Sequence, residues 1–320
     1  MGKSMTEPGH RYGTTTTPST PSPIPGNAND FIEQQLDARI TDIETAFGSD
    51  AVSFNGPILF GVDDLLRNVI EKKCRQKQDI PQKDRRLVVI LTTYGGYIEV
   101  VQRIVDTFRA HYPVVEFVVP NYAYSAGTVL VMSGDAIHMD YYGRLGPIDP
   151  QIETQQAGRM VPALGYLEQY SRLIKKAQDG DITAAEVQLL INGFDQAELY
   201  QYEHQRELSI ALLKEWLTKY KFKSWQVTRT RKKKVTVQMK KSRAAQIAKK
   251  LNDTEKWHSH GYGISKDVLE RDLNLIIDDF GENSVRCGKI RAYYDLLSDY
   301  MVKRGAKGVI HIAGEYRPFT

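Results

Sequence analysis

A serine near the middle of the chain stands where a strand pattern changes into a helix pattern. In "FVVPNYAYSAGTVLVMSGD" (residues 117–135) a β-branched run ends in a proline, and Ser125 then opens a short apolar helical pattern. A helix N-terminus carries a partial positive charge and unsatisfied N–H groups, and both stabilise an anion formed beside it. Ala126 and Gly127 leave room for a substrate to approach. The pattern therefore allows a nucleophile, although a serine at this position is more often a helix N-cap.

A pair of glycines lies one strand–helix unit before this serine. In "TTYGGYIEV" (92–100), Gly95 and Gly96 follow the apolar strand pattern of residues 86–93. Ligands of open parallel sheets bind beyond the carboxyl ends of the strands, and Ser125 also follows such an end. A backbone amide that donates to a developing oxyanion lowers the barrier by roughly 3 to 4 kcal/mol. We therefore expect the two loops to face one crevice, although an ordinary tight turn would also use two glycines.

The elements that position these residues follow from the hydrophobic periodicity. Strands and helices alternate through the first half of the chain at the spacing of βαβ units, which favours a parallel sheet in an α/β fold. The predicted elements are a helix that begins at Asp30 as its N-cap, a strand within 51–60, a helix at 61–76, a strand at 86–93, a helix after the glycine pair, a strand at 113–120, a short helix after Ser125 and a strand at 136–140.

The flanking regions differ in composition. Residues 1–29 are rich in Thr, Ser, Pro and Gly, so we predict a disordered tail. A helical pattern fills residues 161–220, and a final helix begins near Lys266. No linker composition separates two large domains. We predict one domain over residues 30–290, which includes a helical and basic extension at 160–250, followed by a C-terminal helix and tail at 291–320.

Composition excludes several classes of protein. Cys74 and Cys287 lie far apart without a C-x-x-C pattern, which argues against a disulfide framework and a cysteine zinc site and fits a reducing compartment. No motif indicates a bound metal or cofactor. No run approaches the roughly 18 apolar residues of a membrane helix, and the first thirty residues contain no apolar signal region. We expect a cytoplasmic protein with no transmembrane segment.

The motifs together resemble a known family. The succession of a Gly-Gly turn, "YSAGT", "GDAIHMD" and "GRLGPIDPQI" is similar to the ClpP/crotonase superfamily and, within it, to the serine dehydrogenase proteinases, relatives of the peptidase SppA. The resemblance covers about residues 50–155 and resumes at "WHSHGYGISKDVLERDLNL" (257–275). It implies a spiral of βαβ units with a helical C-terminal extension, a homo-oligomer, and hydrolysis of peptide bonds. Many relatives have a membrane segment, which is not found in this sequence.

The resemblance also implies roles for individual residues. Ser125 would be the nucleophile, and the amides of Gly95, Gly96 and Ala126 would form the oxyanion hole, with Gly127 beside them. In this arrangement the carbonyl of the scissile peptide bond would be held between the glycine pair and the start of the helix.

A serine hydroxyl needs a general base, and the sequence offers two kinds. SppA-type enzymes use a lysine some forty to fifty residues after the serine, where Lys175 and Lys176 stand. Burial can lower the pKa of a lysine until it serves as a base, and only one of two adjacent lysines could face the site. His260 matches a histidine of the family, and with Asp149 it would complete a Ser-His-Asp set. We favour His260 with Asp149 over Lys176.

A strongly basic stretch follows the helical region. Residues 219–250 contain thirteen Lys and Arg and no Asp or Glu. Trp225 and Phe222 could stack on bases, so nucleic acid is one possible partner. An acidic protein partner or an anionic membrane surface would use the same charge. A solvated helical arm without a partner is the simplest alternative.

The leading interpretation is a soluble serine peptidase that acts on peptide or protein substrates. A crotonase-like enzyme would use the same oxyanion site on an acyl-CoA thioester and would not need Ser125 as a nucleophile. An α/β-hydrolase is a second alternative, because "AYSAG" is close to a G-x-S-x-G elbow, but Ala123 replaces its first glycine. An inactive peptidase-like scaffold whose basic arm recruits a partner is the third.

Overall fold

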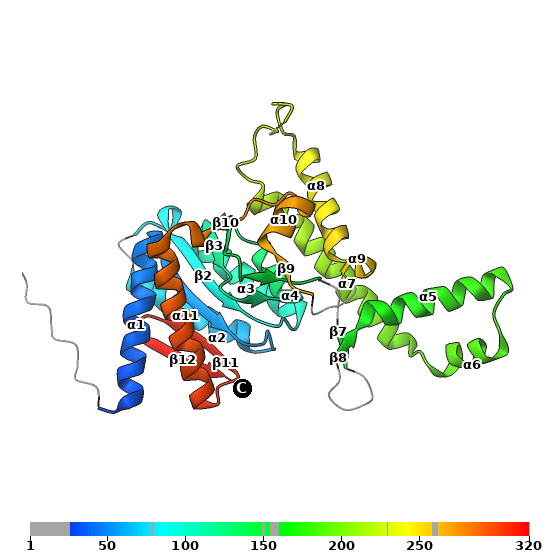
Figure 1. Cartoon of the computed structure of the whole chain (residues 1–320), viewed down its shortest axis with the longest axis horizontal. Coiled ribbons are helices and arrows are strands. Elements are labelled where there is room, and N and C mark those ends of the chain that lie inside the picture. The colour runs from blue at the N-terminus through cyan, green and yellow to red at the C-terminus, as the bar shows by residue number, and fades with distance from the viewer. Residues whose placement is uncertain are drawn as a thin grey trace, which may run out of the picture.

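The computed structural model describes residues 26–77, 80–148, 151–153, 160–228, 230–257 and 262–319. A seven-stranded sheet in the order β10-β5-β3-β2-β1-β11-β12 forms its centre, and helices cover both faces (Figure 1). The predicted disordered tail falls almost entirely outside the described residues.

Five neighbouring strands of this sheet are parallel; four of them were predicted, and β10 was not. They are β1 (Asp50–Asn55), β2 (Arg86–Thr92), β3 (Val114–Val118), β5 (Ala136–Met139) and β10 (Asp278–Asp279). The connections between the first four contain α2 (Val62–Gln76), α3 (Ile98–His111) and α4 (Ala126–Val131). These βαβ units bring the carboxyl ends of β2 and β3, and therefore the glycine pair and the serine, to the same end of the sheet.

Two antiparallel strands complete the sheet. The chain end that was expected to be a tail forms β11 (Gly308–Ile312) and β12 (Glu315–Phe319), and β11 pairs with β1. The predicted domain boundary at residue 290 falls inside one continuous helix, α11 (Ser284–Arg304). Because β11 is buried along its whole length, residues 308–312 are part of the core.

Helices α1 (Ala28–Phe47) and α11 lie side by side on one face of the sheet (Figure 1). Leu36 and Ile40 of α1 and Tyr293 of α11 are fully buried there. The N-cap of α1 is Asn27 rather than Asp30, because the Asn27 side chain accepts hydrogen bonds from two backbone N–H groups.

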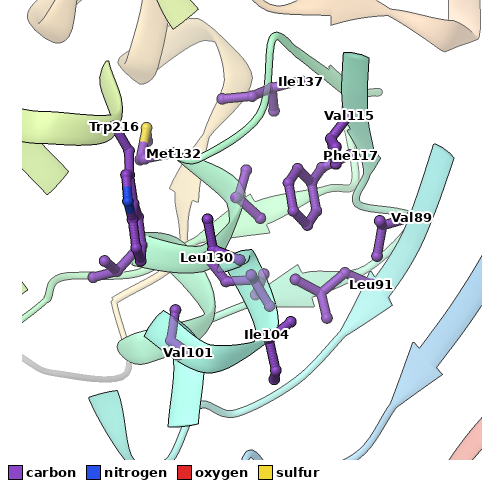
Figure 2. Close-up of a cluster of buried hydrophobic side chains, with 14 of the residues drawn as sticks. Val89, Leu91, Val101, Ile104, Val115, Phe117, Leu130, Met132, Ile137 and Trp216 are labelled. Atoms are coloured by element: carbon purple, nitrogen blue, oxygen red, sulfur yellow. The ribbon is translucent and has the colours of Figure 1, made fainter. Parts of the chain in front are cut away.

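The other face is covered by α2, α3 and α4 together with three helices that follow later in the chain. These are α7 (Gln196–Trp216), α8 (Val237–Leu251) and α10 (Lys266–Leu273). Figure 2 shows Phe117 of β3, Leu130 of α4 and Trp216 of α7 in the same cluster of buried side chains. Trp216 is only 3% exposed, so α7 is part of the main core and holds α4 from outside.

The remaining elements are short or peripheral. Helices α5 (Ala163–Asp179) and α6 (Ala184–Asn192) project from the sheet as a hairpin (Figure 1). The others are η1 (Gln82–Asp84), β4 (Tyr122–Ala123), β6 (Arg144–Leu145), β7 (Gln151–Glu153), β8 (Met160–Pro162), the π-helical turn η2 (Leu217–Lys221), α9 (Thr254–Trp257), β9 (Ile264–Ser265) and η3 (Phe280–Glu282). Among the described helices, none combines the length and apolar character that crossing a bilayer requires.

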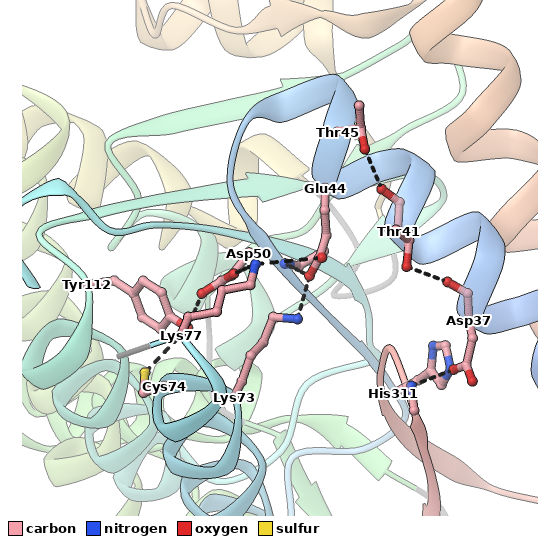
Figure 3. A network of polar contacts seen from close by, with 12 residues as sticks. Asp37, Thr41, Glu44, Thr45, Asp50, Lys73, Cys74, Lys77, Tyr112 and His311 are labelled. Atoms are coloured by element: carbon pink, nitrogen blue, oxygen red, sulfur yellow. Dashed lines mark hydrogen bonds and ion pairs between the residues drawn. The ribbon is translucent and has the colours of Figure 1, made fainter. Parts of the chain in front are cut away.

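A buried polar network joins the elements around the amino end of β1 (Figure 3). Lys73 of α2 forms an ion pair with Glu44 of α1, and Lys77 contacts Asp50 of β1. Tyr112, which follows α3, donates a hydrogen bond of 2.8 Å to Asp50. Burial raises the pKa of Tyr112, and the Asp50 carboxylate raises it further, so the phenol stays a donor. The network fixes α1 and α2 to the end of the sheet opposite the serine.

We predict that Glu44→Gln lowers the free energy of unfolding by about 3 kcal/mol, because the buried Lys73 ammonium loses its carboxylate. Urea denaturation at pH 7 measures the loss. Asp42→Asn, on the same helix with its side chain 59% exposed, is the matched control and should change stability by less than about 0.5 kcal/mol. Equal effects of the two variants would contradict a structural role for the buried pair.

Candidate functional site

The backbone of Ser125 has an unusual conformation. Its φ of 52° and ψ of −123° lie outside the regions that non-glycine residues normally occupy, and such a conformation costs about 1 to 3 kcal/mol. Hydrogen bonds on both sides hold it. The Tyr124 N–H donates to the Thr93 carbonyl over 3.0 Å, and the Thr128 N–H donates to the Ser125 carbonyl over 2.9 Å. The turn between β4 and α4 is therefore fixed by its neighbours and not by the preference of the serine.

The hydroxyl of Ser125 is not used to cap the helix. Ser125 occupies the N-cap position of α4, but its side chain accepts no capping hydrogen bond, and the residue is half-buried. The sequence correctly placed Ser125 at the N-cap position, but the expectation that its side chain caps the helix is wrong. A sharp strand-to-helix turn with a strained serine is also the backbone geometry of a nucleophile elbow.

The glycine pair lies directly against this turn, as expected. Gly95 and Gly96 have φ angles of 102° and 147°. A Cβ atom on Gly95 would come within 2.8 Å of the Ser125 Cβ and 3.2 Å of the Ala126 nitrogen. Only glycine can adopt the conformation at residue 95 and leave this space. Thus the two loops that the sequence placed at one end of the sheet are in contact.

The amides of the predicted oxyanion hole are not equivalent. The Gly95 N–H donates to the Thr93 hydroxyl over 2.9 Å, so it is already engaged. The Gly95 carbonyl and the Tyr97 N–H both bond to Ile58 at 2.9 Å. These bonds to Ile58 come from residues 95 and 97, so neither of them uses the Gly96 N–H.

The start of α4 provides a second amide. Ala126 is the first residue of the helix, so its N–H has no acceptor within it. The Gly127 N–H, in contrast, donates to the Tyr124 carbonyl over 2.8 Å. Gly127 is buried, and a Cβ there would collide with the methyl group of Thr93. Close packing of α4 on β2, and not room for a substrate, accounts for this glycine.

The two outlying motifs of the sequence converge next to the serine. The Gly146 N–H donates to the Thr128 hydroxyl over 2.9 Å, and a Cβ on Gly146 would lie 2.9 Å from the Tyr124 ring. Strand β6 pairs with β4 and also with β9, so a Cβ on Gly263 would lie 3.4 Å from the Tyr124 hydroxyl. The segments "LGPI" and "YGIS" therefore line the residue that precedes Ser125.

The proposed bases differ in what the structure describes. Asp149 and His260 lie outside the described residues. Lys176 is on α5, where its Nζ donates to Glu186 over 2.6 Å and its side chain is 42% exposed. The hydrogen bond from Lys176 lowers the pKa of Glu186 to about 2. Lys175 is exposed. The structure thus shows Lys176 as a solvated, paired ammonium group, whereas a lysine base must be desolvated and free.

Aromatic side chains surround the glycine pair, although none of them is among the predicted site residues. Tyr94 and Tyr122 have ring centroids 4.3 Å apart, and Tyr122 stacks on Tyr124 at 5.3 Å. Phe60 packs against Tyr97 at 4.5 Å. The signal was present in "TYGGY" and "NYAYSAG", where tyrosines flank both motifs. Burial raises the pKa of Tyr124, so it remains a neutral phenol beside the serine.

Among the described residues, no group of three or more His, Cys, Asp or Glu side chains is placed to hold a metal ion. The polar groups around Ser125 are backbone amides, hydroxyls and phenols. Such a set can bind a carbonyl oxygen and stabilise the negative charge that develops on it when the serine attacks.

Comparison with known proteins agrees with this chemistry. Residues 64–196 match the family model described as ClpP-like SDH-type serine proteinase, which confirms the resemblance and the ClpP-like α/β fold over that part of the chain. Two uncharacterized proteins of Methanocaldococcus jannaschii are similar: MJ0137, 35% identical over 82 residues, and MJ1495, 28% identical over 121 residues. These matches cover 26% and 38% of this chain and 29% and 39% of the relatives.

Among the solved structures that are similar to this chain is a mutant of the 1510-N membrane-bound stomatin-specific protease. It is 19% identical to this chain, with a TM-score of 0.30, and the match covers 48% of this chain and 74% of the other. The chain thus matches well under half of the length of the curated relatives.

We predict that Gly95→Ala abolishes any reaction of Ser125 and lowers the free energy of unfolding by about 2 to 4 kcal/mol, because the added methyl group meets the serine turn at a positive φ. Gly288→Ala, on α11 with open space around its Cβ position, is the control and should stabilise by about 0.5 to 1 kcal/mol. Thermal unfolding and active-site labelling measure both. A Gly95→Ala variant with normal labelling would show that the two loops are not as close as described.

Proposed function

We propose that this chain, in which residues 64–196 match the ClpP-like SDH-type serine proteinases, hydrolyses peptide bonds with Ser125 as the nucleophile. The observation that carries the proposal is the strained, uncapped serine at the N-terminus of α4, in contact with Gly95. In an ordinary turn a strained serine only lowers stability, and a glycine would adopt the same conformation with less strain. The strain is explained if the conformation positions a reactive hydroxyl.

The site supports a two-step acyl transfer. The Ser125 oxygen attacks the peptide carbonyl while a base removes its proton, and the N–H groups of Gly96 and Ala126 stabilise the resulting oxyanion. The protonated base then gives its proton to the leaving amine. Water hydrolyses the acyl-enzyme by the reverse route, which restores the serine. In this scheme the Gly95 N–H positions the loop through Thr93 and does not touch the substrate.

We propose His260 as the base and Asp149 as the group that orients it. Gly263 packs beside Tyr124, and His260 precedes Gly263 by three residues, which span at most about 11 Å. Asp149 follows Ile148, whose N–H is bonded to the Leu251 carbonyl near the same strands. Lys176 is less well supported, because Glu186 already holds it.

The substrates and assembly are proposals of the same kind. Aromatic rings on both sides of the glycine pair suit a peptide or protein chain that lies across the loop. We propose a homo-oligomer, since α6 exposes Val187, Leu189 and Ile191 and buries none of its own residues. We also propose that the protein acts in the cytoplasm, which the free thiols of Cys74 and Cys287 favour.

We predict that a fluorophosphonate probe labels the wild-type protein at Ser125 and does not label Ser125→Ala. The peptidase rate of Ser125→Ala should be lower by about 10⁴-fold or more, as is typical when a catalytic serine is removed. Ser224→Ala removes an exposed serine elsewhere and should leave both unchanged. Mass spectrometry locates the label. Failure of folded wild-type protein to react would reject the nucleophile and favour a crotonase-like use of the same oxyanion site.

We predict that His260→Ala lowers kcat by about 10³-fold or more, whereas Lys176→Ala retains kcat within about threefold. The base must be unprotonated, so kcat/KM should increase as the pH rises through about 6 to 7, where imidazoles titrate. His204→Ala, on α7, is the control for loss of a histidine. An increase centred above pH 8 that disappears in Lys176→Ala would assign the base to the lysine instead.

A further inference from the structure

The charge of the chain is unevenly distributed. Thirteen of its 43 cationic residues lie within residues 219–250, where no acidic residue occurs. The remaining 30 share the rest of the chain with all 39 acidic residues. The protein is therefore a net acidic body with one strongly basic region, and the small overall charge of +4 conceals this separation. A role in solubility would not require the positive charge to be clustered, whereas binding of a polyanion would.

The most basic part of this region is a short two-stranded ribbon. The Val235 N–H donates to the Gln226 carbonyl over 2.8 Å, and the Thr228 N–H donates to the Lys233 carbonyl over 2.9 Å. A bridge between Val227 and Lys234 completes the antiparallel pairing. We call residues 226–228 and 230–235 the basic hairpin. It extends from the molecule above α8 in Figure 1, away from the bulk of the sheet.

Four cations of the basic hairpin lack an ion partner among the described residues. Arg231, Lys232, Lys233 and Lys234 are exposed, and the described residues provide no carboxylate within ion-pair distance of them. Elsewhere several cations are paired with carboxylates, as the contacts of Lys73, Lys77, Arg86, Arg103 and Arg109 show. Four adjacent unpaired cations repel one another, so binding of an external anion would lower the electrostatic energy of this segment.

The first turn of α8 continues the same surface. Lys240 donates to the Lys223 carbonyl over 3.0 Å, which joins α8 to the turn before the basic hairpin. Thr236 caps the helix, no acidic residue stands in its first turn, and Lys241 is exposed. The positive end of a fifteen-residue helix therefore adds to the field of the lysines. The basic hairpin together with Lys223, Lys240 and Lys241 forms what we call the basic surface.

The two aromatic residues expected to stack on bases pack on the hydrophobic core. Phe222 is only 8% exposed, and its ring packs edge to face against Trp225 at 5.6 Å. Both belong to the main core or pack against it. The expectation of base stacking is therefore wrong for Phe222, which is part of the core, whereas the half-buried Trp225 packs against that core at the start of the basic hairpin. The basic surface offers charge and backbone shape, and it lacks the stacking platform of single-strand binders.

We propose that the basic surface binds the phosphate backbone of a nucleic-acid duplex. A two-stranded ribbon fits the major groove of B-DNA, which is about 12 Å wide, and lysines with a helix N-terminus are common phosphate contacts. The acidic remainder of the chain is repelled by the same backbone, so a duplex is bound from one side. DNA and RNA duplexes share this phosphate chemistry, and the experiment below separates them.

Binding at this surface leaves the serine accessible. Lys221, just before the basic hairpin, interacts electrostatically with Asp278 and Asp135, which lie at the amino ends of β10 and β5. Ser125 follows the carboxyl end of β3, which runs parallel to β5. The two regions are therefore at opposite ends of the sheet. A bound duplex would hold the protein in place without covering the site.

The test measures fluorescence anisotropy of the full chain with labelled 20-base-pair DNA and RNA duplexes between about 50 and 200 mM salt. Each phosphate contact contributes about −0.9 to the slope of log K against log salt. The quadruple variant R231Q/K232Q/K233Q/K234Q should reduce the steepness of that slope by about three to four and weaken binding at least tenfold at 100 mM salt. Binding of either duplex with this loss supports the proposal, and the tighter duplex identifies the source.

The matched control is R75Q/K83Q/K303Q/K307Q, which removes the same charges from exposed positions elsewhere and should bind within about twofold of wild type. Circular dichroism confirms that both variants are folded. Equal losses in the two variants, or no saturable duplex binding at 50 mM salt, would overturn the proposal. So would tighter binding of single strands, of polyglutamate, or of vesicles that contain phosphatidylserine. Because the readout is binding, failure of the peptidase assignment would leave this result unaffected.

Discussion

The contacts of Thr93 are the constraint on which the candidate site depends. Its backbone bonds to Tyr122 and Tyr124 on one side, and its hydroxyl accepts the Gly95 N–H. Its methyl group fills the space left by Gly127 at the start of α4. One residue at the end of β2 therefore fixes the glycine pair, the turn of Ser125 and the helix behind it. A side chain without both a hydroxyl and a methyl group could not make all of these contacts.

The strain at Ser125 is small beside the packing that holds it. Every residue of α4 is buried, and Val129, Leu130 and Val131 are each fully enclosed. Burial of a single side chain of this kind contributes about 1.5 to 3 kcal/mol, so three of them offset a conformational cost of about 1 to 3 kcal/mol. Trp216 on α7 covers the helix from outside (Figure 2). The extension therefore supports the site, although it contributes none of the residues around the serine that the structure describes.

Much of this arrangement could be predicted because its signals are local. Apolar runs such as residues 87–91 define the parallel strands, and the topology of a parallel sheet then brings Gly95 and Ser125 to one end. The parts that were missed depend on partners distant in sequence. Strand β11 forms by pairing with β1, which is far away in the sequence, and Phe222 is buried by the main core, which no local pattern reveals. The separate tasks of Gly95, Gly96 and Gly127 depend on hydrogen bonds that the sequence does not reveal.

The environments of two lysines show why solvation decides the choice of base. A lysine becomes a base only where burial lowers its pKa. In the part of the chain that the structure describes, Lys221 has such an environment, and burial lowers its pKa to about 8 even though Asp278, Asp135 and Glu116 oppose the change. It lies at the amino ends of the strands, beyond the reach of Ser125. Lys176 has the opposite environment, half-exposed and bound to Glu186. A lysine base would need the buried environment that Lys221 has and a position next to Ser125 that neither lysine has. A histidine, in contrast, titrates near neutral pH without burial.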